Sequence, residues 1–129
     1  MQNKIVTLQK IKILFVEDEK ELRDIISDTL TKLQANFLTA INGEDGLKVF
    51  QNNSDIDLIV TDINMPLMNG LDMIEKIREN NKDFPIVVMS AHTETEYIKK
   101  AKELGVSEYL LKPFDFLKFI NLVSELNIK

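Results

Sequence analysis

The sequence contains no cysteine and no tryptophan, and it has a single histidine. The absence of cysteine excludes disulfide bonds, thiolate zinc sites and cysteine nucleophiles. One histidine excludes a metal centre built from several imidazoles. The four glycines form neither a GxGxxG nor a P-loop pattern, and Ser90 lies in MSAHT instead of GxSxG. These patterns argue against dinucleotide binding, P-loop nucleotide hydrolysis and a nucleophile-elbow hydrolase.

Long hydrophobic runs are absent as well. No apolar stretch approaches the roughly 20 residues that cross a bilayer. The first ten residues, MQNKIVTLQK, lack the apolar centre of a signal peptide. We therefore predict a cytoplasmic protein without a membrane partner. The net charge of −5 gives no general attraction for nucleic acid or anionic lipid, so direct nucleic-acid binding is not expected.

What the sequence does contain is a regular alternation of two patterns over 129 residues, a length that fits one domain. The first pattern is a short apolar run. Several of these runs are continuous aliphatic segments, which are typical of strands covered on both faces. The predicted strands are KILFV (12–16), ANFLTA (35–40), DLIVT (57–61), PIVVMS (85–90) and EYLLK (108–112).

The second pattern is a segment of helical period between these strands. The predicted helices cover 20–33, a short stretch after Asn42-Gly43, residues around 71–77 and 97–104, and 114–127. Gly105 follows the fourth of them, where helices commonly end in a left-handed residue. Five strand–helix units in this order predict an α/β fold, a doubly wound five-stranded parallel sheet with helices on both faces. Residues 1–10 lie outside the pattern as an N-terminal arm or added turn, and 11–129 form the domain.

Polar side chains stand where four of the predicted strands end. They are the acid pair Glu17-Asp18, the carboxylate of Asp62, the hydroxyl of Ser90 and the amine of Lys112. The carboxyl ends of parallel strands meet at one edge of a sheet, where sites form in this type of fold. Taken singly, each acid has an ordinary explanation as a helix cap, and Ser90 as a turn hydroxyl. Independent caps give no reason for a strand-terminal lysine, so the combination indicates one site.

Three carboxylates at one edge repel one another and therefore either raise a pKa or hold a cation. Oxygen ligands without histidine or thiolate favour a hard ion, Mg²⁺ or Ca²⁺. The spacing after Asp62 does not fit a calcium-binding EF-hand loop, with Leu67 at the sixth position and Met73 at the twelfth. Mg²⁺, with Mn²⁺ as a possible substitute, is the expected cofactor.

A carboxylate beside Mg²⁺, a hydroxyl and a lysine suits phosphoryl transfer, in which positioning and neutralisation of phosphoryl oxygens supply most of the catalysis. Asp62 is the expected nucleophile. Lys112 and the cation would offset charge, and Ser90 would donate a hydrogen bond to a phosphoryl oxygen.

Four motifs in this order, FVEDE, IVTDINMPLMNG, VVMSAH and YLLKPF, closely resemble those of the receiver domains of bacterial response regulators, the CheY-like family. The resemblance runs from about Ile11 to Ile128 and implies the strand order 2-1-3-4-5. It implies that Asp62 accepts the phosphoryl group, with Asp18 as a direct metal ligand together with Asp62. The backbone carbonyl of Asn64 would be a further ligand, and Glu17 would act through water.

The same resemblance implies a switch. Ser90 corresponds to the switch hydroxyl, Tyr109 to the switch aromatic and Lys112 to the phosphate-binding lysine, followed by a cis peptide bond to Pro113. Asn64 and His92 occupy the two positions that tune hydrolysis of the acyl phosphate. Glu17 stands where Asp is common and Ser90 where Thr is common, and both keep the chemistry.

The implied partners are a histidine kinase or histidine phosphotransfer protein as donor, and an effector protein or domain as output. The effector would bind the face made by the fourth helix of the pattern, the fifth strand and the last helix. That last helix is apolar over an arc of roughly 220°, wider than the roughly 100° that faces one core. We therefore predict that part of it meets a partner, such as a second copy in a homodimer or an adjoining domain. The apolar residues are Phe116, Leu117, Phe119, Ile120, Leu122, Val123 and Leu126.

Two other functions remain to be weighed. A Mg²⁺-dependent aspartyl phosphatase of the haloacid dehalogenase type would carry DxD after its first strand, whereas this chain has Asp62-Ile63-Asn64 after its third. A receiver-like interaction module that is never phosphorylated could have lost any of the site residues, yet Asp18, Asp62, Ser90 and Lys112 are all present. The chain is thus not expected to be an enzyme beyond its own phosphorylation and autodephosphorylation.

Overall fold

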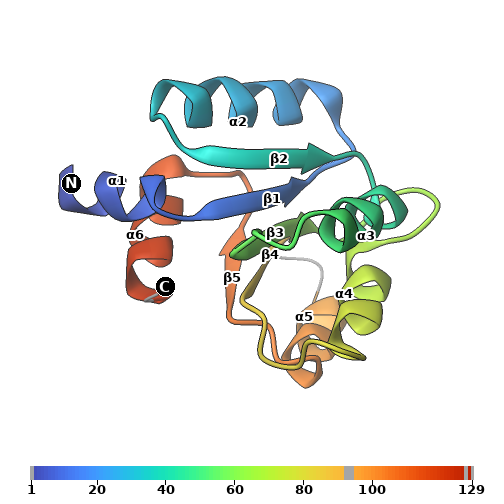
Figure 1. The fold of residues 1–129 in the computed structure, drawn as a ribbon. Coiled ribbons are helices and arrows are strands. Elements are labelled where there is room, and N and C mark those ends of the chain that lie inside the picture. The colour runs from blue at the N-terminus through green and yellow to red at the C-terminus, as the bar shows by residue number, and fades with distance from the viewer. Residues whose placement is uncertain (1, 92–94, 127, 129) are drawn as a thin grey trace.

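A computed structural model describes residues 2–91, 95–126 and 128 of the chain. It shows five parallel strands in one sheet with helices on both faces (Figure 1). The strands lie in the order β2-β1-β3-β4-β5, so the predicted fold class and strand order are confirmed. They are β1 (Lys12–Val16), β2 (Asn36–Ala40), β3 (Leu58–Asp62), β4 (Ile86–Ser90) and β5 (Glu108–Leu111).

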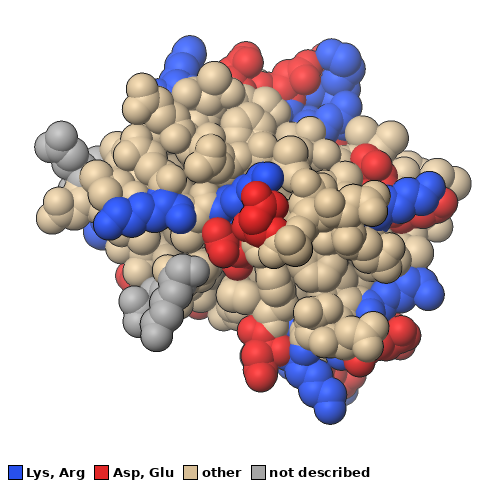
Figure 2. Space-filling view, viewed as in Figure 1, with Lys and Arg blue, Asp and Glu red and all other residues tan. Residues whose placement is uncertain are grey.

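Six helices complete the described part of the chain. They are α1 (Gln2–Gln9), α2 (Lys20–Lys32), α3 (Gly43–Asn52), α4 (Gly70–Arg78), α5 (Thr95–Glu103) and α6 (Phe116–Leu126). Helices α1, α2 and α6 pack on one face of the sheet, and α3, α4 and α5 pack on the other. No helix in the described ranges is long and apolar enough to cross a membrane. Acidic and basic side chains are interspersed on the face shown in Figure 2.

The two central strands explain the continuous aliphatic runs in the sequence. Every residue of β3 and β4 is buried. Along each strand, alternate side chains enter opposite cores: Val60 packs toward α2 and α6, and Ile59 toward α3, α4 and α5. A strand covered on both faces needs apolar residues at successive positions, which removes the usual alternation with polar residues.

Local capping sets the helix boundaries. Asn42 and Asn69 accept backbone N–H groups at the starts of α3 and α4. Gly105 after α5 has a φ of 70°, the left-handed conformation that its position indicated. The last helix begins at Phe116, two residues later than predicted, because the Asp115 side chain caps its first turn by accepting the N–H of Leu117.

Arg78, at the end of α4, joins two loops. Its guanidinium donates hydrogen bonds to four backbone carbonyls, at 2.8 to 2.9 Å. Burial lowers the pKa of this guanidinium from its ordinary value. The bonds fix the turn before β4 to the turn before β5, and these two strands lead to Ser90 and to Lys112 directly after β5. The acceptors are the carbonyls of Asn81, Phe84, Leu104 and Gly105.

The N-terminal residues form a helix that covers α6. Leu8 of α1 is fully buried in the core that also holds Phe119 and Val123 of α6. Lys4 donates a hydrogen bond of 2.7 Å to the Asn121 side chain. Much of the wide apolar arc on α6 is thus covered within the chain, whereas Leu117 remains 52% exposed.

The burial of Leu8 makes α1 part of the domain core. Replacement of Leu8 by alanine should lower the free energy of unfolding by about 2–4 kcal/mol, because it opens a cavity between α1 and α6. The matched control Val6→Ala, at a side chain that is 41% exposed, should change it by less than about 0.5 kcal/mol. Urea denaturation measures both. Equal effects of the two substitutions would show that α1 is not integral to the core.

Candidate functional site

The strand register brings the predicted residues to one edge of the sheet. Asp62 pairs with Met89, and Ser90 pairs with Leu111, so these strand ends lie in adjacent rows. Glu17 directly follows β1, the other neighbour of β3. Side chains from four separate segments of the sequence therefore meet above the carboxyl ends of β1, β3, β4 and β5.

Three carboxylates are the centre of this edge. Glu17, Asp18 and Asp62 each offer an oxygen, and these oxygens all lie within 4.8 Å of one another. Glu17 and Asp62 are buried, with 1% and 3% of their surfaces exposed, whereas Asp18 is exposed. Such a cluster opens to solvent on the side of Asp18 and is closed beneath by the sheet.

Glu17 has one oxygen paired and one unpaired. Its Oε2 accepts the backbone N–H of Glu19 at 3.0 Å, and Oε1 is buried without a hydrogen-bond partner in the described residues. The pKa of Glu17 is raised to about 7, chiefly by burial; the charge of Asp62 adds to the rise, whereas the hydrogen bond from Glu19 opposes it. A buried carboxylate oxygen without a donor is what a bound cation or its water ligand would satisfy. The donor set therefore fits Mg²⁺.

Asp62 is held from two sides. Its Oδ2 accepts a hydrogen bond of 2.7 Å from the Lys112 ammonium, and its Oδ1 accepts the backbone N–H of Ile63 at 2.8 Å. Lys112 is itself positioned, because its backbone N–H donates to the Ser90 carbonyl at 2.9 Å. Its peptide bond to Pro113 is cis, as the resemblance implied. The carboxylate thus has a fixed orientation beside a cation that is about one-third exposed.

Ser90 lies on β4, the strand next to that of Asp62, and Tyr109 lies on β5, on the far side of β4. The Ser90 hydroxyl is fully buried and has no hydrogen-bond partner in the described residues. The Tyr109 hydroxyl lies 3.5 Å from the carbonyl of Ile98 in α5, and its side chain packs with the core on that face of the sheet. Partial burial raises the pKa of the Tyr109 phenol.

Asn64 and His92 are the remaining predicted site residues. Asn64 is exposed in the loop after β3, two residues from Asp62. His92 lies outside the described residues.

Two positioning residues were missed by the sequence analysis. A Cβ at Gly70 would overlap the Asp62 carbonyl oxygen, so only glycine lets α4 begin this close to β3. Arg23 donates a hydrogen bond of 2.8 Å to the Glu17 carbonyl and ties the acid pair to α2. The Asn69-Gly70 dipeptide, a common turn sequence, could have indicated the role of Gly70. Nothing in the local pattern distinguished Arg23 from a solvated arginine.

Known proteins share both the sequence and the fold. The family model of the response regulator receiver domain matches residues 13–124. A CheY homologue of Campylobacter jejuni is 36% identical over 107 residues, which cover 81% of this chain and 82% of that protein. The transcriptional regulatory protein CusR of Escherichia coli is 37% identical over 118 residues, which cover 90% of this chain and 51% of CusR.

Solved structures give the same answer. The chemotaxis protein CheY4 of Vibrio cholerae superposes with a TM-score of 0.78 at 30% identity, covering 88% of this chain and 98% of that one. CheY in the CheX-CheY-BeF3-Mg complex of Borrelia burgdorferi gives a TM-score of 0.82 at 26% identity, covering 92% and 90%. With this fold, a family match over most of its length and the receiver motifs, the chain belongs to the response regulator receiver domain family of two-component signalling.

Proposed function

We propose that this domain is a phosphorylation switch in which Asp62 accepts a phosphoryl group from a histidine kinase or a histidine phosphotransfer protein. The observation that carries the proposal is the position of Asp62, whose carboxylate is 2.7 Å from Lys112 and within 4.8 Å of the acid pair. A carboxylate nucleophile needs positive charge nearby, because the incoming phosphoryl group brings further negative oxygens. Lys112 is one source of that charge, and a cation held by the carboxylates would be the other.

In the proposed reaction, a carboxylate oxygen of Asp62 attacks the phosphorus of the donor phosphohistidine. The new O–P bond forms as the P–N bond breaks, and the electron pair of that bond leaves with the donor imidazole. Lys112 then neutralises part of the charge on the acyl phosphate, and the buried Ser90 hydroxyl donates a hydrogen bond to one of its oxygens. The domain reacts once per phosphoryl group received and uses no separate substrate, so we do not class it as an enzyme.

A bound Mg²⁺ would neutralise phosphoryl oxygens during the transfer. Asp18 and Asp62 would hold it directly, the Asn64 carbonyl would complete the protein ligands, and Glu17 would bind it through water. Mn²⁺ would fit the same oxygen ligands. Asn64 and His92 are the residues that we propose to set the lifetime of the acyl phosphate.

The signal would pass from Asp62 to the effector surface through Ser90 on β4 and Tyr109 on β5. Movement of Ser90 toward the phosphoryl group would free space for Tyr109. The Tyr109 hydroxyl now lies 3.5 Å from the Ile98 carbonyl, which is the upper limit for a hydrogen bond and makes this contact weak. The surface formed by α5, β5 and α6 would change with it and select the effector. A shift from 1:99 to 99:1 between two states requires about 5.5 kcal/mol of differential stabilisation.

Phosphorylation of Asp62 can be tested directly. Incubation with Mg²⁺ and a small phosphodonor such as acetyl phosphate should add one phosphoryl group, detected by intact mass. Asp62→Asn should abolish the adduct, and the control Asp55→Asn should keep it, because Asp55 is an exposed acid paired with Lys12 before β3. An adduct that survives in Asp62→Asn would refute this phosphoacceptor. Absence of an adduct with every donor and kinase would favour the unphosphorylated interaction module, and sustained phosphate release a phosphatase.

The raised pKa of Glu17 gives a pH dependence with a defined sign. Without Mg²⁺, the folded state keeps a proton on Glu17 up to about pH 7, whereas its ordinary pKa is 4.5. Protonated Glu17 therefore stabilises the folded state fully below pH 4.5, and this stabilisation is lost as the pH rises toward about 7. Mg²⁺ affinity should strengthen over the same range, since the cation favours the charged carboxylate.

Urea denaturation in EDTA and Mg²⁺ titration, each repeated across this pH range, measure the two effects. Glu17→Gln removes the titrating group and should flatten the stability profile between pH 4.5 and about 7 relative to the parent. Identical profiles for the two proteins would show that Glu17 does not carry the effect.

The switch predicts a change at Tyr109. With Mg²⁺ and beryllofluoride as a phosphoryl mimic, the ring signals of Tyr109 in NMR spectra should shift, because the side chain leaves its present contact with α5. Ser90→Ala should bind the mimic and yet lose most of this shift, since the hydroxyl that couples the two residues is gone. A Tyr109 signal that is unchanged in the parent on addition of the mimic would contradict the switch.

A further inference from the structure

One residue near the site adopts a backbone conformation that its side chain disfavours. Leu67, in the loop between β3 and α4, has a φ of 68°. This left-handed region is unfavourable for a leucine because of its Cβ. The side chain gains no burial in exchange, since 85% of its surface is exposed. An unfavourable backbone conformation that displays an aliphatic group to solvent points to a contact outside the chain.

A second aliphatic side chain lies beside it. Ile41, directly after β2, is 51% exposed and borders the same shallow hollow of about 190 Å³ as Leu67. The backbone around both residues is well held: Gly43 donates to the Met68 carbonyl and Gly70 to the Ile63 carbonyl, each at 2.8 Å. The two side chains thus stand on a preformed surface.

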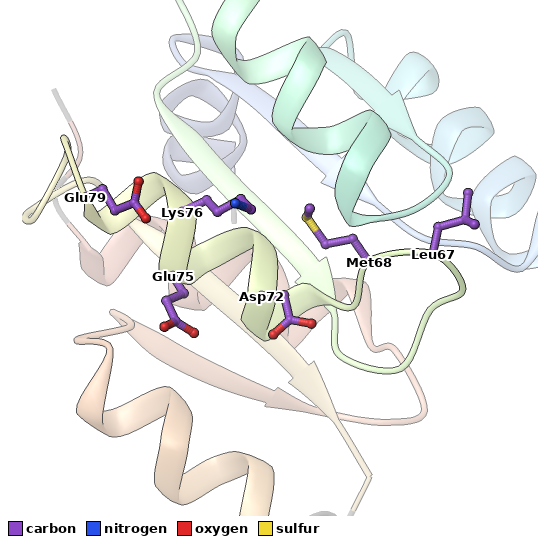
Figure 3. Close-up of a pocket in the computed structure, with 6 residues that line it drawn as sticks. All are labelled: Leu67, Met68, Asp72, Glu75, Lys76 and Glu79. Atoms are coloured by element: carbon purple, nitrogen blue, oxygen red, sulfur yellow. The ribbon is translucent and has the colours of Figure 1, made fainter.

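The surroundings of these two residues are predominantly acidic. A larger hollow of about 350 Å³ runs from Leu67 along α4, where it is lined by Met68, Asp72, Glu75, Lys76 and Glu79 (Figure 3). The smaller hollow is lined by Glu44, Asp45 and Lys48 of α3. Five carboxylates and two lysines therefore border the surface.

Few of these charges are neutralised. Lys48 lies 3.9 Å from Glu44, and Glu75 lies 3.6 Å from Lys100 of α5. Asp72 and Glu79 have no ion pair with any residue in the described part of the chain. A ligand for this surface should therefore bring positive charge as well as an apolar group.

We propose that Ile41, Leu67 and the acidic side chains of α3 and α4 form a docking surface for a cationic segment of another protein. The segment would place an aliphatic residue against Leu67 and Ile41, with lysines or arginines beside it over Asp72 and Glu79. A second copy of the chain is disfavoured, because a symmetric contact would set these acidic borders against each other. The surface is separate from the α5-β5-α6 surface and needs no phosphoryl group on Asp62.

A synthetic peptide serves as the probe. We choose an amphipathic helix of leucine, lysine and alanine, about 14 residues long, with leucines on one face and lysines along its borders. Added to the unphosphorylated protein, it should shift the amide NMR signals of the loop after β3 and of α3 and α4. Binding should weaken with salt, because the charges are exposed. A peptide with glutamate in place of lysine should not bind.

Substitutions locate the contact. Leu67→Asn removes the aliphatic group and suits the left-handed backbone, so it should preserve the fold and weaken the peptide about tenfold, or 1.4 kcal/mol. The matched control Ile25→Asn changes an exposed aliphatic side chain on α2, outside both proposed surfaces, and should leave the affinity unchanged. Equal affinity of the parent and Leu67→Asn, shifts centred on the Asp18 edge, or no shifts at about 1 mM peptide would overturn the inference. The peptide is added to unphosphorylated protein, so its binding does not require a phosphoryl group on Asp62. A negative result in the peptide experiment would therefore leave the proposed phosphorylation untouched.

Discussion

The structure depends most on holding three carboxylates together at one edge of the sheet. Their oxygens lie within 4.8 Å of one another; two unit charges about 4 Å apart interact by about 4 kcal/mol at an effective dielectric of 20. The Lys112 ammonium and the Ile63 N–H oppose this repulsion at Asp62. At Glu17, burial instead favours the protonated form. The cluster is thus poised to exchange a proton for a cation.

The core beneath the cluster makes that arrangement possible. The fully buried β3 and β4 hold Asp62 and Ser90 in adjacent rows, and Arg78 fixes the turns that lead into β4 and β5. Packed aliphatic strands do not deform gradually. A charge change at Asp62 would therefore be taken up by the loops and side chains at the carboxyl edge, where the Ser90 hydroxyl has no partner among the residues that the structure describes.

The fold and the gathering of the site could be predicted because both follow from strong, local patterns. Continuous aliphatic runs located the strands, and parallel pairing then placed Asp62 and Lys112 at one edge. The role of α1 could not be predicted in this way: an eight-residue helix is not stable alone, and only tertiary packing shows Leu8 covering α6. Nor does any sequence rule assign Leu67 a left-handed backbone, which depends on how the loop meets α3 and α4.

The covering helix also bears on how α6 can respond. Phe119 and Val123 of α6 share a core with Leu8, and Asn121 accepts a bond from Lys4, so the middle of α6 is anchored to α1. The start of α6 follows Lys112 and Pro113 closely and carries the exposed Leu117. A displacement that begins at Lys112 would therefore alter the first turn of α6 before it moved the anchored part. Beyond that turn, the side of α6 next to β5 stays open, because Leu122 and Glu125 border a hollow together with Tyr109 and Leu111. The output surface would therefore extend along β5 and this side of α6, while α1 holds the opposite side in place.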